Sequence, residues 1–178
     1  MKMRILIFAL FVIVSCDKFK KTENVARIET LNEVAPSNGI DLEVYDFNGF
    51  KKFLEEKDGK VHVINFWATW CAPCVKELPY FEKINEDYRD ENVKVLLVSL
   101  DFPHLYESKL KPFIINKKIQ SKVIALDDAD MNTWIPKVNS KWSGSIPATI
   151  IYKNGESKFY EQSFTYEELQ QEIKHFLK

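Results

Sequence analysis

Two cysteines separated by two residues carry the clearest chemistry in this sequence. Cys71 and Cys74 follow a nearly continuous apolar stretch, residues 61–67, and precede a helical pattern. Such a stretch is typical of a strand covered on both faces. Unpaired backbone N–H groups at the start of a helix favour an anion, so a cysteine there is held partly as thiolate, the form that attacks disulfides. We therefore expect Cys71 to be the nucleophile and Cys74 to close a reversible disulfide with it.

A cysteine pair at this spacing is also half of a tetrahedral zinc site. The other half would need further ligands, and the three histidines, His62, His104 and His175, are scattered without ligand spacing. We therefore favour redox chemistry and predict no metal site. The disulfide of Cys71 and Cys74 is expected to serve without an added cofactor.

The N-terminus has the features of an export signal. Lys2 and Arg4 introduce an unbroken run of ten apolar residues, which is too short to span a bilayer. Residues 13–16, Ile-Val-Ser-Cys, resemble a bacterial lipobox, in which the cysteine is acylated. The alternative is an ordinary secretory signal with an incidental cysteine. We expect residues 1–15 to be removed and Cys16 to attach the mature chain to a membrane through lipid.

Composition indicates one globular domain behind a tether. The segment 16–39 is charged and polar, whereas residues 40–178 carry the periodic patterns of a folded domain. A chain of 178 residues with 46% hydrophobic content suits a single core that needs no structural disulfide. The formal net charge is −1 and no basic face is visible, so we expect no nucleic-acid partner. We take a monomer as the default state.

Strand and helix patterns alternate along the domain. Asn154-Gly155 is a strong two-residue hairpin signal, and Thr165 with Glu168 predicts a capping box. Alternating units argue for parallel strands, and the hairpin adds an antiparallel edge, so we predict an α/β fold with a mixed sheet between helices. The predicted strands are 42–47, 61–67, 93–100, 123–126, 148–153 and 156–162, and the predicted helices are 50–57, 71–88, 106–118, 131–138 and 165–178.

This order of elements resembles a thioredoxin-like fold. Residues 66–74, Phe-Trp-Ala-Thr-Trp-Cys-Ala-Pro-Cys, together with Glu77 and Leu78-Pro79, resemble the membrane-anchored thioredoxin-like proteins of bacterial envelopes. That group includes the TlpA- and ResA-type thiol-disulfide oxidoreductases. The resemblance covers about residues 40–178 and implies a three-layer fold with an N-terminal strand-helix extension. It also implies a helix-strand insertion at 106–126.

The resemblance assigns a second part of the site to the loop before the final hairpin. Pro147 matches the proline that lies in cis opposite the cysteines of thioredoxin folds, the alternative being a trans proline at a strand entrance. The backbone of Ile146 is then expected to pair with an extended client segment. Trp70 is expected to screen the thiols or contact the client, whereas Trp67 belongs to the core. Trp142 either borders the same groove or packs inside.

A proton-handling role is implied for Glu77. Asn65, six residues before Cys71, stands where ordinary thioredoxin has a buried aspartate thought to manage the proton of the resolving thiol. An amide cannot exchange that proton. In ResA-like proteins a glutamate at the Glu77 position takes part in this step. The alternative is a solvated glutamate on the helix surface.

The resemblance implies a protein-disulfide reductase outside the cytoplasmic membrane. Its client would be apocytochrome c or another exported protein, and a membrane thiol reductant would reset it. Ala72-Pro73 adds no polar group that would stabilise the thiolate further, so we expect a reducing potential. One alternative is a thiol peroxidase, whose Pro-x-x-x-Thr-x-x-Cys pattern is not matched at residues 69–71. Another is a copper-delivery module that recruits His104 or His175 to the thiols.

Overall fold

A computed structural model describes residues 39–178. The predicted signal peptide, Cys16 and all of the tether except Gly39 lie outside the described residues. Within the described part, no helix is long and apolar enough to cross a membrane.

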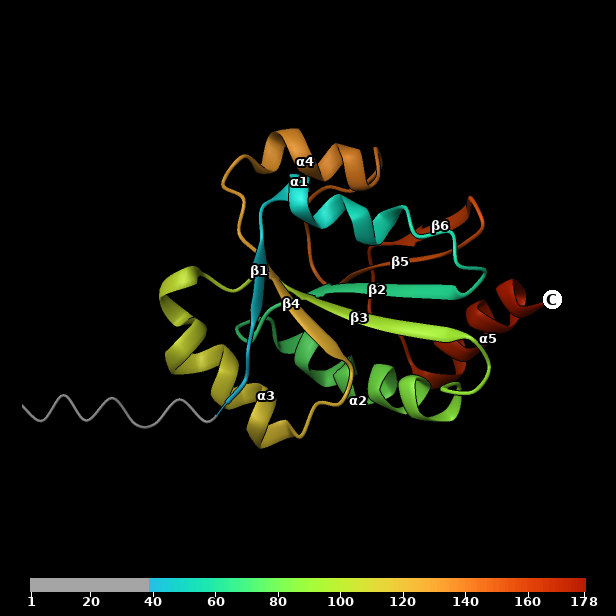
Figure 1. The fold of residues 1–178 in the computed structure, drawn as a ribbon, viewed down its shortest axis with the longest axis horizontal. Coiled ribbons are helices and arrows are strands. Elements are labelled where there is room, and N and C mark those ends of the chain that lie inside the picture. Colours follow the sequence, from blue (N-terminus) through green and yellow to red (C-terminus); the bar gives the residue numbers. More distant parts are fainter. Residues whose placement is uncertain (1–38) are drawn as a thin grey trace, which may run out of the picture. The chain divides into compact units, whose positions relative to one another are not determined.

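Six strands form one mixed sheet in the order β1-β4-β3-β2-β5-β6 (Figure 1). The four strands from β1 to β2 are parallel, and β5 runs antiparallel to both β2 and β6. The predicted mixed α/β sheet with an antiparallel hairpin edge is therefore confirmed. The strands are β1 Glu43–Tyr45, β2 Val61–Trp67, β3 Val93–Ser99, β4 Lys122–Leu126, β5 Ala148–Lys153 and β6 Glu156–Tyr160.

Helices cover both faces of this sheet, giving the three layers of a thioredoxin-like fold (Figure 1). Helices α1 and α4 pack on one face, and α2, α3 and α5 pack on the other. The α-helices are α1 Phe47–Phe50, α2 Ala72–Asp87, α3 Lys111–Lys117, α4 Met131–Val138 and α5 Tyr166–Leu177. Two 3-10 helices, Lys51–Leu54 and Pro103–Leu105, and one π-helix, Tyr106–Leu110, complete the helical segments of the described chain.

Strand β2 lies between two hydrophobic cores. All seven of its residues are buried. Because side chains alternate along a strand, Val63 and Trp67 enter the core beneath α2 and α5, whereas Ile64 and Phe66 enter the core beneath α1 and α4. This two-sided burial explains the continuous apolar run, and it fixes the carboxyl end of the strand, from which the cysteine loop begins.

The first strand and helix differ from the sequence prediction. The strand predicted at 42–47 ends at Tyr45, and Phe47 begins α1. Asp46 is the reason, because its side chain accepts a hydrogen bond from the backbone N–H of Gly49 at 2.8 Å and caps the helix. Asn48-Gly49 therefore lies within the helix. The N-terminal strand-helix extension itself is present.

The later elements agree closely with their sequence signals. Asn154 and Gly155 have φ of 51° and 94°, the left-handed conformations that a tight hairpin turn requires. Thr165 and Glu168 form the predicted capping box at the start of α5. The predicted insertion is also present, with the π-helix and α3 in place of one continuous helix and β4 after them.

Candidate functional site

The two cysteines form a disulfide at the N-terminus of α2, with their Cα atoms 5.3 Å apart. Cys71 is the N-cap residue, and its Sγ accepts a hydrogen bond from the backbone N–H of Cys74 at 3.3 Å. Cys71 is 6% exposed and Cys74 is fully buried. Cys71 is therefore the sulfur that a partner can reach, and the adjacent amide stabilises a thiolate there when the disulfide is reduced. This geometry supports the nucleophile and resolving roles predicted from the sequence.

The proline loop faces this sulfur. The Ile146–Pro147 peptide bond is cis, as the resemblance implied. The carbonyl oxygen of Ile146 lies 3.7 Å from Cys71 Sγ. Pro147 is buried, whereas Ile146 remains partly exposed beside it. The backbone of Ile146 is thus within reach of a segment bonded to Cys71, and its pairing with a client stays a prediction.

Glu161 anchors the proline loop, and sequence reasoning missed it. Its carboxylate accepts hydrogen bonds from the backbone N–H groups of Ser143 at 3.1 Å and Ser145 at 3.0 Å, and from the Ser143 hydroxyl. Trp142 supports the loop from inside, since its Nε1 donates to the Ser145 carbonyl at 2.8 Å and its ring packs on Phe66. Trp142 is only 5% exposed, so it packs inside.

Glu77 is buried one helical turn beyond Cys74. It is 1% exposed, which excludes the solvated-surface alternative. Its Oε1 accepts from Asn65 Nδ2 at 3.0 Å, and its Oε2 accepts from the backbone N–H of Phe164 at 2.7 Å. Burial raises the pKa of Glu77 to about 7, although both hydrogen bonds act in the opposite direction. The carboxyl group therefore gains and loses its proton near neutral pH, as proton handling requires.

Asn65 can remain bonded to Glu77 in either protonation state. Its Nδ2 donates to Thr149 Oγ1 at 3.1 Å as well as to Glu77, and all three side chains are buried. Its Oδ1 has no hydrogen-bond partner among the described residues. Rotating the amide by half a turn would place Oδ1 where it accepts from a protonated Glu77 and from the Thr149 hydroxyl. The asparagine therefore positions the carboxyl group without adding a second buried acid.

Trp67 is buried and Trp70 is exposed, in agreement with the core position predicted for Trp67. Trp67 is fully buried in the core, whereas Trp70 is 56% exposed and stacks on Phe102. The loop before Trp70 is held by Asp101, whose carboxylate accepts from the backbone N–H of Thr69 at 3.0 Å and from its hydroxyl at 2.5 Å. The exposed ring thus belongs to a loop held in place by hydrogen bonds, and Cys71 is the next residue along the chain.

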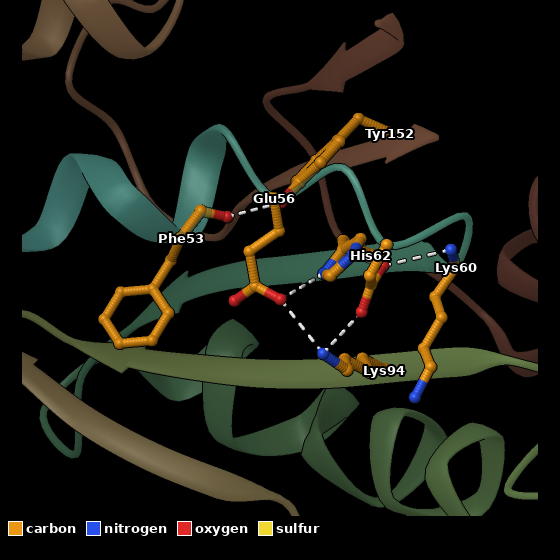
Figure 2. Close-up of polar contacts among 7 residues, drawn as sticks. Phe53, Glu56, Lys60, His62, Lys94 and Tyr152 are labelled. Carbon is orange, nitrogen blue, oxygen red and sulfur yellow. Dashed lines mark hydrogen bonds and ion pairs between the residues drawn. The ribbon is translucent and has the colours of Figure 1, made fainter. Parts of the chain in front are cut away.

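A separate polar cluster occupies the opposite end of β2. Figure 2 shows His62 with Glu56 and Lys94, and His62 Nε2 lies 2.8 Å from Asp58 Oδ1. Glu56, Asp58 and His62 bring potential metal-ligand atoms within 4.8 Å of one another, a grouping that the sequence spacing did not reveal. The Lys94 ammonium lies 2.9 Å from Glu56 and 2.7 Å from Asp58, so it already balances both carboxylates. Within residues 39–178, this is the one such group of three, and neither cysteine belongs to it.

Comparison with known proteins identifies relatives of this chain. The profile of the AhpC/TSA family matches residues 35–156. The thiol-disulfide oxidoreductase ResA of Geobacillus kaustophilus is 29% identical over 130 residues, covering 68% of this chain and 66% of the relative. The ResA protein of Geobacillus thermodenitrificans is 27% identical over 146 residues, covering 77% and 75%. The chain thus spans 66% and 75% of the length of these two relatives.

A solved structure supports the fold independently. The crystal structure of a secreted thiol-disulfide isomerase from Corynebacterium glutamicum has a TM-score of 0.57 with this chain. The match covers 70% of this chain and 80% of that one, at 18% sequence identity. At this identity the similarity is one of fold.

Proposed function

The chain belongs to the AhpC/TSA family and is a homologue of ResA-type thiol-disulfide oxidoreductases, and on this basis we propose that it is a protein-disulfide reductase of the bacterial cell envelope. The observation that carries the proposal is the position of the cysteine pair. Cys71 caps a helix, lies 3.7 Å from the Ile146 carbonyl and is more accessible than Cys74. Buried Glu77 on the same helix supplies a group that titrates near neutral pH.

The proposed cycle consists of two thiol-disulfide exchanges. The Cys71 thiolate attacks one sulfur of a client disulfide, and the second client sulfur leaves as a thiolate that takes up a proton. Cys74 then passes its proton to Glu77, attacks the Cys71 sulfur and releases the first client sulfur, which is protonated in turn. Two electrons pass to the client, and its two thiolates take protons from water and from Glu77, which returns to its carboxylate form. The Cys71–Cys74 disulfide remains. A membrane thiol reductant returns the pair to the dithiol.

The direction of electron flow follows from the stability of the reduced state. A strongly oxidising pair needs a thiolate stabilised well beyond the effect of the helix amides. Ala72 and Pro73, the residues between the cysteines, bring no charge or hydrogen-bonding side chain to the sulfur. Exported proteins whose cysteines must stay free, such as apocytochrome c, are clients of matching chemistry.

The reduction potential of the pair tests this direction. Equilibration of the purified protein with a dithiothreitol redox buffer should give a value near that of thioredoxin, about −270 mV. The fraction oxidised is read from alkylated and unalkylated forms by mass spectrometry. A value near −120 mV, typical of a strong thiol oxidant, would make the protein an oxidase and overturn the assignment.

A lipid anchor at Cys16 would place this chemistry on a membrane. Residues 13–16 have the lipobox order, and Cys16 is the one cysteine outside the redox pair. Acyl chains on that residue are sufficient for stable attachment. Labelled palmitate is expected to appear in the protein expressed in a bacterium, and Cys16→Ser should release the protein from the membrane fraction. Membrane attachment of the Cys16→Ser variant would show that another feature anchors it.

A further inference from the structure

Exposed apolar side chains gather beside the redox pair. Trp70, Phe102 and Met131 are 56%, 56% and 45% exposed, and all three line one cavity of about 420 Å³. The rings of Trp70 and Phe102 stack with centroids 6.4 Å apart. We call this cavity the Trp70 groove; Trp134 and Ile146 also line it. Contiguous exposed apolar surface of this kind marks a binding surface.

The Trp70 groove lies next to the reactive sulfur, although Cys71 is not itself part of the lining. Ile146 belongs to its lining, and the carbonyl oxygen of the same residue lies 3.7 Å from Cys71 Sγ. Trp70 is the direct chain neighbour of Cys71. A polypeptide segment bonded to Cys71 would therefore have its flanking side chains at the groove.

The walls of the groove are fixed before any partner binds. Buried Asp101 joins the loops after β2 and β3, because its carboxylate accepts from Thr69 N–H at 3.0 Å and from the Ser99 hydroxyl at 2.9 Å. On the far side, Trp134 Nε1 donates to the Asp128 carbonyl at 3.0 Å and ties α4 to the loop after β4. A preformed apolar pocket of this kind loses little ordering entropy when a ligand enters.

The acidic residues of the groove favour a basic ligand over an acidic one. Its lining includes Asp101, Asp127 and Asp128, and no lysine, arginine or histidine belongs to it in the described chain. Asp101 and Asp128 already accept protein hydrogen bonds, whereas the exposed carboxylate of Asp127 has no bonded partner within residues 39–178. A complementary segment carries an apolar side chain for the rings and a cation for Asp127.

We propose that the Trp70 groove binds the segment flanking the client's disulfide, and that it selects a client with an aromatic or aliphatic residue next to a lysine or arginine. The inference rests on the proposed disulfide reductase function and names its substrate class. Phe102 and Trp70 hold the apolar side chain, and Asp127 attracts the basic one.

The test compares cyclic disulfide peptides that differ only beside one cysteine. The reduced full-length protein is mixed with peptides carrying Phe-Lys, Phe-Glu or Gly-Gly at that place, and peptide reduction is followed by quenched-flow mass spectrometry. The Phe-Lys peptide should have a second-order rate constant about fivefold above that of the Phe-Glu peptide at low salt, and added salt should reduce the difference. Its advantage over the Gly-Gly peptide should be about tenfold.

Two variants assign these effects to the groove. Asp127→Asn should make the Phe-Lys and Phe-Glu rates equal, and Phe102→Ala should remove most of the advantage over the Gly-Gly peptide. Ile115→Ala is the matched control, because Ile115 is 41% exposed on α3 and lies outside the groove. That control should keep the order of the three peptides.

The outcomes separate this inference from the proposed function. Equal rates for all three peptides would overturn the groove assignment and leave the reductase standing. Failure to reduce both the peptides and 2-hydroxyethyl disulfide, a small neutral disulfide, would overturn the reductase itself. Dimerisation that Phe102→Ala abolishes, without peptide selectivity, would assign the groove to a second copy of this chain and contradict the inference.

Discussion

Replacing Cys71 with serine should reduce insulin disulfide reduction to the uncatalysed background. The attacking sulfur is lost, and a serine hydroxyl cannot take its place because exchange needs a thiolate. Cys74→Ser should also abolish turnover, yet the first half of the reaction remains possible because Cys71 keeps its sulfur. The two variants are compared by the rate of insulin precipitation with dithiothreitol as the reductant.

Cys16→Ser is the matched control for these cysteine substitutions. Cys16 lies outside the proposed redox site, so this variant should reduce insulin at the wild-type rate.

Hydrogen peroxide consumption and copper binding are followed in the same samples. Retained insulin reduction by Cys71→Ser would contradict the assignment of the nucleophile. Peroxide turnover in place of insulin reduction would support the peroxidase alternative, and tight copper binding by the reduced pair would support the copper-delivery alternative.

Replacing Glu77 with glutamine should slow the step in which Cys74 resolves the mixed disulfide, by about 100-fold near pH 7. The carboxylate accepts the Cys74 proton in the proposed cycle, and an amide cannot. The wild-type rate of this step should rise with pH as Glu77 ionises around its pKa of about 7, and the variant should lose that dependence. Release of a fluorescent thiol from a preformed mixed disulfide measures the step alone.

The same substitution should change how stability depends on pH. Burial raises the pKa of Glu77 from its ordinary value of 4.5 to about 7, so its neutral form is favoured in the folded state. Its contribution to stability is therefore complete below about pH 4.5 and is lost as pH rises through about 7. Glu77→Gln stays neutral throughout, so at pH 8 it should be more stable than the wild type by ~1–3 kcal/mol. Urea unfolding at pH 5 and pH 8 measures the difference.

Glu86→Gln provides the control, since Glu86 is an exposed glutamate of the same helix. It should leave both the resolution rate and the pH dependence of stability unchanged. An unchanged pH profile in Glu77→Gln would remove Glu77 from the proton transfer. The glutamine remains compatible with the buried site because it can accept from Phe164 N–H and donate to a rotated Asn65 amide.

Features decided by neighbouring residues were predictable from the sequence. The Thr165 capping box and the Asn154-Gly155 turn depend on a few adjacent positions. The position of Cys71 at a helix N-terminus followed from the change of hydrophobic period after β2. The predicted strand wrongly included Phe47, and this error also has a local cause. Asp46 caps α1, so the strand ends earlier than predicted.

Features that depend on distant contacts were not predictable in the same way. Buried Glu77 accepts a hydrogen bond from the backbone N–H of Phe164, 87 positions away, and no local sequence pattern predicts this contact. Glu161 and the proline loop that it supports lie in two segments that no short sequence motif connects. The cluster of His62 with Lys94 likewise needs β2 and β3 side by side in register. In the candidate site, the sequence pattern predicted which groups react, and the tertiary contacts set their burial and orientation.

The proposed mechanism is tested by finding which sulfur bonds to a client. Cys74→Ser, reduced and mixed with a disulfide peptide, should accumulate a mixed disulfide because the resolving thiol is absent. Peptide mapping by mass spectrometry should place that bond on Cys71 in most of the protein. A variant that stays unmodified while Cys71 remains open to alkylation, or a bond found only on Cys16, would contradict the mechanism.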